Sequence, residues 1–153
     1  MAWTEWGAAM GVFGTHTPGP SALAPLTEDP SGASRRFVEA VCSLEVERVL
    51  CHIMDGTRLA FGKRAGAVGR VEIRKFLVRG FSLLHSLHCA PAVIWTKGNL
   101  SVIEADMCCE RLDGAFLSFP LTIVLRFSGP SISGIRVFTY EPEVVSQFLS
   151  PRN

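Results

Sequence analysis

The 153-residue chain lacks the strong net charge of one sign that is typical of proteins that bind nucleic acids or anionic membranes. Its 15 Lys and Arg residues against 14 Asp and Glu residues give a formal net charge of +1, which is too small to attract a polyanion. It also lacks a long uninterrupted apolar run, because a charged residue breaks every candidate for a membrane span. We therefore expect neither a nucleic-acid partner nor a membrane partner.

Cysteines are few and odd in number, without the spacing of a disulfide framework: Cys42, Cys51, Cys89, Cys108 and Cys109. This usage favours a reducing compartment. The N-terminus "MAWTEWGAAMGVFG" has no basic segment followed by an apolar core, so no signal peptide is expected. The sequence thus predicts a cytoplasmic protein.

Signatures of metal and cofactor sites are also scarce. His88 and Cys89 with the adjacent Cys108 and Cys109 do not supply a convincing fourth ligand for tetrahedral zinc. The glycine-containing stretch "FGKRAGAVG" lacks the lysine-serine or lysine-threonine ending of a phosphate loop. We expect no metal and no organic cofactor.

What the sequence does contain is enough apolar material for one compact domain, with 48% hydrophobic and 19% charged residues. Residues 1–33 carry the proline-rich stretch "THTPGPSALAPLTEDPSGAS" and show no apolar period, so they are predicted to be an irregular extension. Residues 34–147 are predicted to form the domain, and residues 148–153 a C-terminal tail.

Helical periodicity comes first along this domain and strand periodicity follows. Ser34 is expected to cap a first helix, and "GRVEIRKFLVRGFSLLHSL" places apolar residues at helical spacing with its arginines on the solvated side. From Ala90 the period changes to two, with turns at Gly98-Asn99 and Asp113-Gly114. This order predicts an α+β domain with helices on one side of a curved, mostly antiparallel sheet.

Two acids, Glu104 and Asp106, lie in the middle of an apolar strand and share one of its faces. If Asp113-Gly114 is a two-residue turn, Asp106 lies opposite Leu121, and the acids face the most apolar side of the sheet. Carboxylates there must be partnered, protonated, or lining a cavity.

The alternative is a loop of three residues, which reverses the pairing and sends both acids to solvent. Ile103, Ala105 and Met107 then form the core face of the strand. The pocket interpretation is favoured, and the solvent interpretation stays open.

Four stretches resemble the SnoaL-like branch of the nuclear transport factor 2-like superfamily: "RFVEAVCSLEVERVL", "FGKRAGAVGRVEIRKFL", "EADMCCERLDG" and "PLTIVLRF…ISGIRVFTY". The resemblance covers about residues 34–142. It implies a cone-shaped α+β barrel with a deep pocket. Relatives include polyketide cyclases, ketosteroid isomerases, scytalone dehydratases and limonene epoxide hydrolases, as well as binding modules without catalytic activity. Most of them need no cofactor, and many are dimers.

In this resemblance, Asp106 matches the aspartate that limonene epoxide hydrolases use as an acid. Glu104 and Val137 stand where those enzymes have an arginine and a second aspartate. Leu59 and Phe61 replace their tyrosine and asparagine, which weakens an epoxide hydrolase assignment. Many SnoaL-like relatives have an aspartate near the end of the last strand, and Tyr140 occupies about that place here.

"HSLHC" places His85 and His88 at the expected end of the long helix, where they can handle protons or simply stabilise the helix terminus. His88 is the preferred candidate, because the family often has a histidine there. The expected catalytic residues are Asp106, Glu104, His88 and Tyr140. The expected substrate-binding residues are Trp95, Phe61, Leu59, Phe119, Leu121, Cys108 and Val137.

Two hypotheses follow. The first is a cofactor-free acid/base enzyme, an isomerase, cyclase or dehydratase, acting on a hydrophobic polyketide- or terpenoid-like metabolite. The second is a non-catalytic small-molecule-binding or dimerisation module of the same fold. A homodimer through the outer face of the sheet is expected in either case, from Phe116, Pro120 and Val124 on that face and from the habit of the family.

Overall fold

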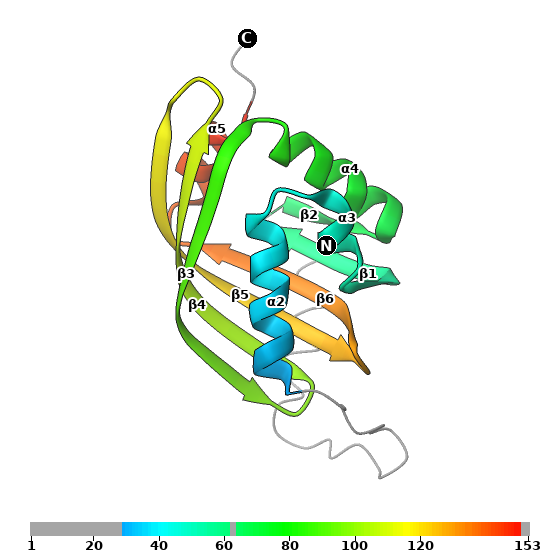
Figure 1. Ribbon diagram of the computed structural model, residues 1–153. Helices are drawn as coiled ribbons and strands as arrows, with labels where there is room; N and C mark the ends of the chain where they lie inside the picture. Colours follow the sequence, from blue (N-terminus) through cyan, green and yellow to red (C-terminus); the bar gives the residue numbers. More distant parts are fainter. Residues whose placement is uncertain (1–28, 62–63, 151–153) are drawn as a thin grey trace.

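The computed structural model describes residues 29–61 and 64–150 (Figure 1). Two helices, α2 (Pro30–Cys42) and α3 (Val46–Leu50), precede the first strand, and a third, α4 (Arg70–Phe81), lies between the second and third strands. Six strands follow the order β1 (Ile53–Phe61), β2 (Arg64–Val68), β3 (Leu84–Lys97), β4 (Leu100–Arg111), β5 (Phe116–Ser128) and β6 (Ser131–Thr139). A short helix, α5 (Pro142–Phe148), comes last. The predicted α+β class is confirmed.

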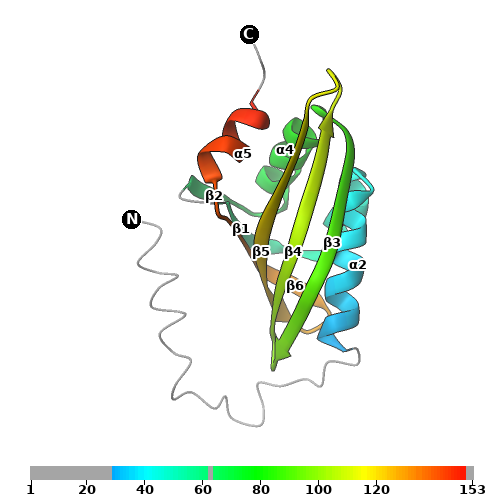
Figure 2. The same ribbon diagram turned by 90° about the vertical axis from the view of Figure 1, so that its left-hand side faces the viewer.

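The strands form one sheet in the order β2-β1-β6-β5-β4-β3. The pair β1 and β6 is parallel, and the other neighbours are antiparallel. The sheet is strongly bent but does not close into a barrel, and α2, α3 and α4 lie on its concave side (Figures 1 and 2). Within the described residues, no helix is both long enough and apolar enough to cross a membrane.

The first helix begins earlier than expected. Asp29, not Ser34, caps it, with a carboxylate oxygen 3.1 Å from the backbone N–H of Ser31, and Pro30 occupies the first helical position, where no N–H is needed. The fully buried Ser34 hydroxyl instead lies 2.6 Å from the carbonyl oxygen of Pro30 and 2.7 Å from the hydroxyl of Ser101 on β4. The last four residues of the predicted extension therefore belong to α2.

The long helix also ends earlier than the periodicity indicated. α4 stops at Phe81, and the chain then enters β3 at Leu84. His85 and His88 are therefore strand residues, both exposed, and the interpretation of a histidine pair at a helix terminus is wrong. The solvated basic side of α4 is confirmed, because Arg74 pairs with Glu47 and Lys75 with Glu72 at the surface.

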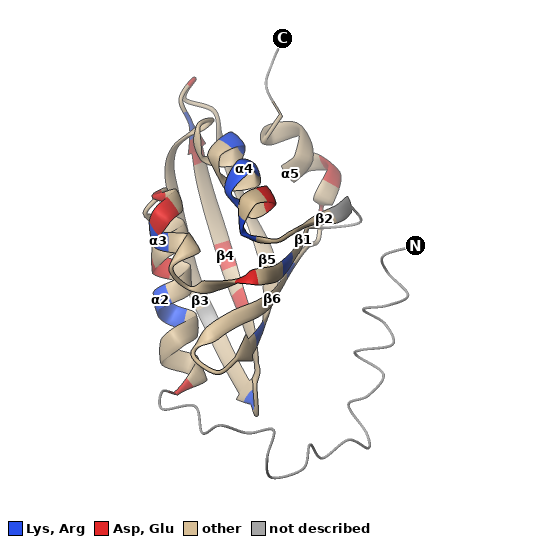
Figure 3. Ribbon diagram, turned by 90° about the vertical axis from the view of Figure 1, so that its right-hand side faces the viewer, with Lys and Arg blue, Asp and Glu red and all other residues tan. Residues whose placement is uncertain are grey.

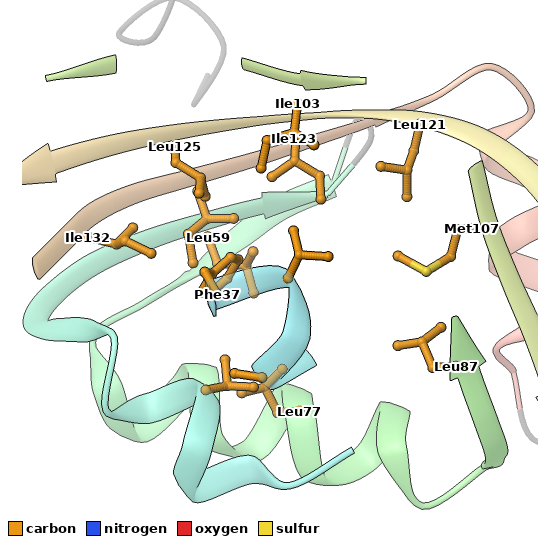
Figure 4. Close-up of a cluster of buried hydrophobic side chains, with 14 of the residues drawn as sticks. Phe37, Leu59, Leu77, Leu87, Ile103, Met107, Leu121, Ile123, Leu125 and Ile132 are labelled. Carbon is orange, nitrogen blue, oxygen red and sulfur yellow. The ribbon is translucent and has the colours of Figure 1, made fainter. Parts of the chain in front are cut away.

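The core lies between the concave face of the sheet and these helices (Figure 4). Ile103 and Leu125 are fully buried, and Ile73 of α4 is 1% exposed. The inward side of β4 consists of Ile103, Ala105, Met107 and Cys109. Burial of apolar side chains on this scale is the dominant favourable contribution to folding.

The loop between β4 and β5 decides which way each side chain points. The N–H of Arg111 donates to the carbonyl oxygen of Ala115 at 2.8 Å, so the connection contains Leu112, Asp113 and Gly114. Gly114 has φ +81°, a backbone conformation that suits glycine. The connection thus has three residues instead of two, and the pairing of β5 shifts by one residue.

Candidate functional site

Five predicted substrate-binding residues lie on the concave side of the sheet. Leu59, Phe119 and Leu121 are buried in the core, and Phe61 and Val137 are half-buried against it. Val137 of β6 lies opposite Ile123 of β5, and Phe61 lies opposite Val137. All five therefore belong to the hydrophobic core or pack against it.

The other predicted site residues do not join them. Glu104 lies opposite Thr122, Asp106 opposite Pro120, and Cys108 opposite Ser118. The prediction that the acids face the apolar side of the sheet is wrong, because the three-residue loop reverses the parity of the pairing. Glu104, Asp106 and His88 are exposed, Cys108 is half-buried, and Trp95 and Tyr140 are 55% and 76% exposed.

Except for Tyr140, which follows the end of β6, these side chains occupy what we call the convex face, the outward positions of strands β3 to β6. The two-residue turn at Gly98-Asn99 is confirmed, so Trp95 lies opposite Val102, and Val93 opposite Glu104. Further along the same strands, Ala90 faces Asp106, and His88 faces Cys108. On β5 and β6 the face continues with Phe116, Ser118, Pro120, Thr122, Val124, Arg126, Arg136 and Phe138.

Charges are separated along the convex face. Lys97 and Arg126 flank Leu100 at the end of the β3–β4 hairpin, and Arg136 lies one row further, opposite Val124. Glu104, Asp106 and Glu110 follow along β4 toward the other end. Figure 3 shows these acidic positions in red along β4. The face is thus basic at its hairpin end and acidic beyond it.

The concave side has thiols where the sequence analysis placed carboxylates. Cys109 is buried, and Cys42 and Cys89 are half-buried against the core. Burial raises the pKa of the Cys89 thiol to about 12, with smaller contributions from Cys42, Asp106 and Cys108. Burial likewise raises the pKa of Cys109 to about 12. These thiols stay protonated at neutral pH and are poor nucleophiles.

A buried arginine, which the sequence analysis did not single out, anchors the last helix. Arg111 donates to the carbonyl oxygens of Phe148 at 2.8 Å and Ser150 at 3.3 Å, and its guanidinium lies 3.2 Å from the carboxylate of Asp113. Its guanidinium carbon lies 5.8 Å from the centre of the Phe148 ring. These contacts are structural, because they satisfy the orphan carbonyls at the end of α5.

A hollow of about 350 Å³ lies at the start of α4, and none of the residues that line it is a predicted site residue. Its lining residues are Asp55, Val68, Gly69, Arg70, Val71 and Arg74. Both arginines already have protein partners, since Arg70 donates to the carbonyl oxygen of Ile53 at 3.2 Å and Arg74 pairs with Glu47. Across residues 29–61 and 64–150, no three His, Cys, Asp or Glu side chains are grouped so that they could hold a metal ion.

Comparison with solved structures identifies the fold. An NTF2-like protein of unknown function from Burkholderia pseudomallei has a TM-score of 0.71 at 14% identity, over 81% of this chain and all of that one. A protein named as a SnoaL-like polyketide cyclase from Jannaschia has a TM-score of 0.70 at 14% identity, over 85% and 98% of the two chains.

A ketosteroid isomerase-like protein from Catenulispora acidiphila, solved with trimethylamine, has a TM-score of 0.66 at 16% identity, over 78% and 93% of the two chains. No protein-family model matches the sequence, and no curated protein matches it. Identities this low establish architecture and leave activity open. The chain has the nuclear transport factor 2-like fold, shared with SnoaL-like and ketosteroid isomerase-like proteins.

Proposed function

We propose that this protein is a binding module that associates through the convex face of its sheet, with a second copy of the chain as partner. The observation that carries the proposal is the exposure of large aromatic side chains on that face. Trp95 is 55% and Phe116 65% exposed, and half-buried Val93, Val102, Val124 and Phe138 accompany them. Aromatic residues surrounded by polar groups are typical of protein interfaces.

The charge pattern favours a second copy over an unrelated partner. Lys97 and Arg126 lie at one end of the face, whereas Asp106 and Glu110 lie toward the other. Two copies that stack face to face with antiparallel strands bring the basic end of each over the acidic end of the other. In such a two-fold symmetric dimer, both copies contribute the same face. The opposite charges at the two ends of that face set the orientation of one copy relative to the other.

The acid/base enzyme expected from the sequence needs a carboxylate or imidazole in a pocket with little water. Among residues 29–61 and 64–150, the buried polar side chains are Ser34, Thr57, Ser101, Arg111 and Arg136, none of which is a carboxylate or an imidazole. Glu104, Asp106 and His88 lie together on the outside. The geometry therefore favours association over proton transfer.

A hydrophobic small molecule is the second candidate ligand. The half-buried inward side chains of Phe61 and Val137, beside buried Leu59, favour it. Two solved neighbours that are similar in fold carry the name polyketide cyclase. A panel of aromatic polyketides that raises the melting temperature of the parent chain but not of a Val137→Asp variant would support it.

Association is tested by sedimentation of the full chain over a concentration series up to about 100 µM, where an interface of modest affinity forms. Trp95→Glu and Phe116→Glu should shift the chain toward monomer. Val68→Glu and Val71→Glu are matched controls, because these side chains are 58% and 66% exposed but lie off the convex face. Association that the two face substitutions leave unchanged would contradict the proposal.

A further inference from the structure

α4 presents apolar side chains to solvent on the side that faces away from the core. Ile73 and Leu77 are buried, whereas Val71 is 66% and Val78 52% exposed. Residues two turns apart on a helix lie on the same side of it, so the two valines share one side of α4. Val68, at the end of β2, is 58% exposed close to Val71. Exposed apolar side chains that gather on one element are typical of a contact surface.

The side chains between the two valines are basic. Arg74 and Lys75 lie on the same side of the helix, one turn from each valine, and both are exposed. Figure 3 shows basic positions in blue along α4. The helix has four basic residues and one acid: Arg70, Arg74, Lys75, Arg79 and Glu72. Apolar and basic groups thus alternate along what we call the outer stripe of α4, which consists of Val71, Arg74, Lys75 and Val78.

The acids beside these two cations are held at the surface. Arg74 pairs with Glu47 of α3, and Lys75 lies 2.8 Å from a carboxylate oxygen of Glu72. Each of these four side chains is at least 48% exposed. Ion pairs this exposed contribute little to stability. A carboxylate of a partner can therefore take the place of Glu47 or Glu72 beside the cation.

The hollow at the start of α4 continues the outer stripe. Val71 and Arg74 line it from the helix, and Val68 lines it from β2. Its volume of about 350 Å³ accommodates one large apolar side chain of a partner, the kind of buried anchor that contributes most to protein interfaces. Asp55 also lines the hollow, so the acidic groups of a partner fit further along the helix, beside Arg74 and Lys75.

We propose that the outer stripe of α4 and the adjoining hollow dock an acidic amphipathic helix of another protein. Its apolar side chains pack on Val71 and Val78, one of them enters the hollow, and its carboxylates pair with Arg74 and Lys75. The spacing by helical turns favours a helix as partner, because the ridges of one helix fit the grooves of another. An anionic membrane fits less well, since charges interrupt the apolar stripe, whereas helices that lie on membranes have a continuous apolar face. This docking stands independently of the convex face and of the proposed function.

The test uses the full chain and a dye-labelled designed peptide, a helix with leucines two turns apart and glutamates between them on the same side. Fluorescence anisotropy should show saturable binding with a dissociation constant of about 100 µM or below, as expected of a small interface. A peptide with lysines in place of the glutamates should bind at least about tenfold more weakly. Binding that does not saturate, or equal binding of the two peptides, would overturn the proposal.

Charge reversal locates the contact on α4. Arg74→Glu/Lys75→Glu should weaken binding of the acidic peptide at least about tenfold, because it places carboxylates against carboxylates. Arg35→Glu/Lys97→Glu is the matched control, since it makes the same change in net charge at two exposed residues of α2 and β3. Binding to the control should stay within about twofold of the parent. Equal losses in the two variants would show that only the net charge of the chain matters, which would overturn the proposal.

Truncation of the two valines tests the apolar part of the contact. Val71→Ser/Val78→Ser should weaken peptide binding several-fold and leave the melting temperature unchanged, because both side chains are largely exposed. Leu112→Ser/Val144→Ser is the matched control, with side chains that are 69% and 43% exposed outside α4. Unchanged binding in the first variant would overturn the proposal, since the peptide would then be held by charge alone.

Other occupants of this surface give different results. Vesicles of phosphatidylcholine and phosphatidylglycerol should not bind the chain, and binding that Arg74→Glu/Lys75→Glu abolishes would assign the surface to an anionic membrane. Without peptide, Val71→Ser/Val78→Ser should leave self-association unchanged, and a shift toward monomer would assign the surface to a second copy. Either result would overturn the proposal. Trp95→Glu, which tests the convex face, should leave peptide binding unchanged, so the two proposals can fail separately; a loss of binding there would place the peptide on the convex face and overturn the docking on α4.

Discussion

Asp106 lies opposite Pro120 in the register between β4 and β5, and both side chains are exposed on the convex face. The neighbouring pair, Ala105 and Leu121, is buried on the other side. A loop shorter by one residue would instead place Asp106 opposite Leu121, a residue of the buried side of β5. The position of the acids, and with it the kind of function available to the molecule, therefore depends on a short surface loop.

Removing the charge of Asp106 should hardly affect folding. Asp106→Asn and Glu104→Gln are each expected to change the free energy of unfolding by less than about 0.5 kcal/mol, because exposed carboxylates stay hydrated in both states. Ala105→Asp is the contrasting variant, since Ala105 is 5% exposed. It should cost about 3 kcal/mol or more by burying a charge. Urea denaturation measures all three, and a large loss for Asp106→Asn would contradict the outward orientation.

The hydroxyl of Thr57 should stabilise the junction of β1 and β6. Thr57 is fully buried, and its Oγ1 lies 2.6 Å from the carbonyl oxygen of Ile132 and 2.8 Å from that of Met54, and accepts the Met54 N–H at 3.0 Å. Thr57→Val should cost about 1–3 kcal/mol, because the backbone groups lose their partner in a dry environment. Thr57→Ser should recover most of this loss.

Thr139 offers a matched control for that substitution. Its hydroxyl is buried and has no hydrogen-bond partner among the described residues. Thr139→Val should therefore be neutral or slightly stabilising in the same denaturation experiment. Equal losses at the two positions would mean that the shape of the threonine side chain, not its hydrogen bonding, is what matters.

The buried thiols predict a loss of stability in alkaline solution. Burial raises the pKa of Cys109 from 9.0 to about 12 in the folded chain, so the folded state holds this proton more tightly than the unfolded state does. The contribution is complete below pH 9 and declines as pH rises toward 12. Comparing unfolding at about pH 8 and about pH 10.5, Cys109→Ala should reduce the decline. Cys51→Ala, at an exposed position, should leave it unchanged.

The domain should fold without its N-terminal segment. Removing residues 1–28 retains Asp29 and the whole of α2, so cooperative thermal unfolding is expected to persist. Removing residues 1–33 also deletes the cap and the first turn of that helix, which should cost about 1 kcal/mol more. Loss of cooperative unfolding in the shorter deletion would show that the segment belongs to the core.

The sequence by itself determined the class of fold and most of the hairpin that includes Trp95. Apolar residues at helical spacing give helices one apolar face, and apolar residues at alternate positions give a sheet one apolar face. Packing of these faces against each other therefore follows from the pattern alone. Gly98-Asn99 fixed the first register, because few residues accept the backbone angles of a tight turn. Phe119 and Leu121 were correctly placed inward by the alternation of apolar residues along their strand.

Only the tertiary structure decided which side of β4 faces the core. From the sequence, either side of this strand could face the core: the side with Ile103, Ala105 and Met107, or the side with Glu104 and Asp106. The number of residues in the loop after the strand decides between them. The burial of Arg136 could not be foreseen either, since its position opposite Val124 follows from pairing distant in sequence. His88 was assigned to a helix because local spacing carries no information on where a strand begins after Phe81. Periodicity is a local property of the sequence, whereas strand register and side-chain burial depend on contacts between segments far apart in the chain.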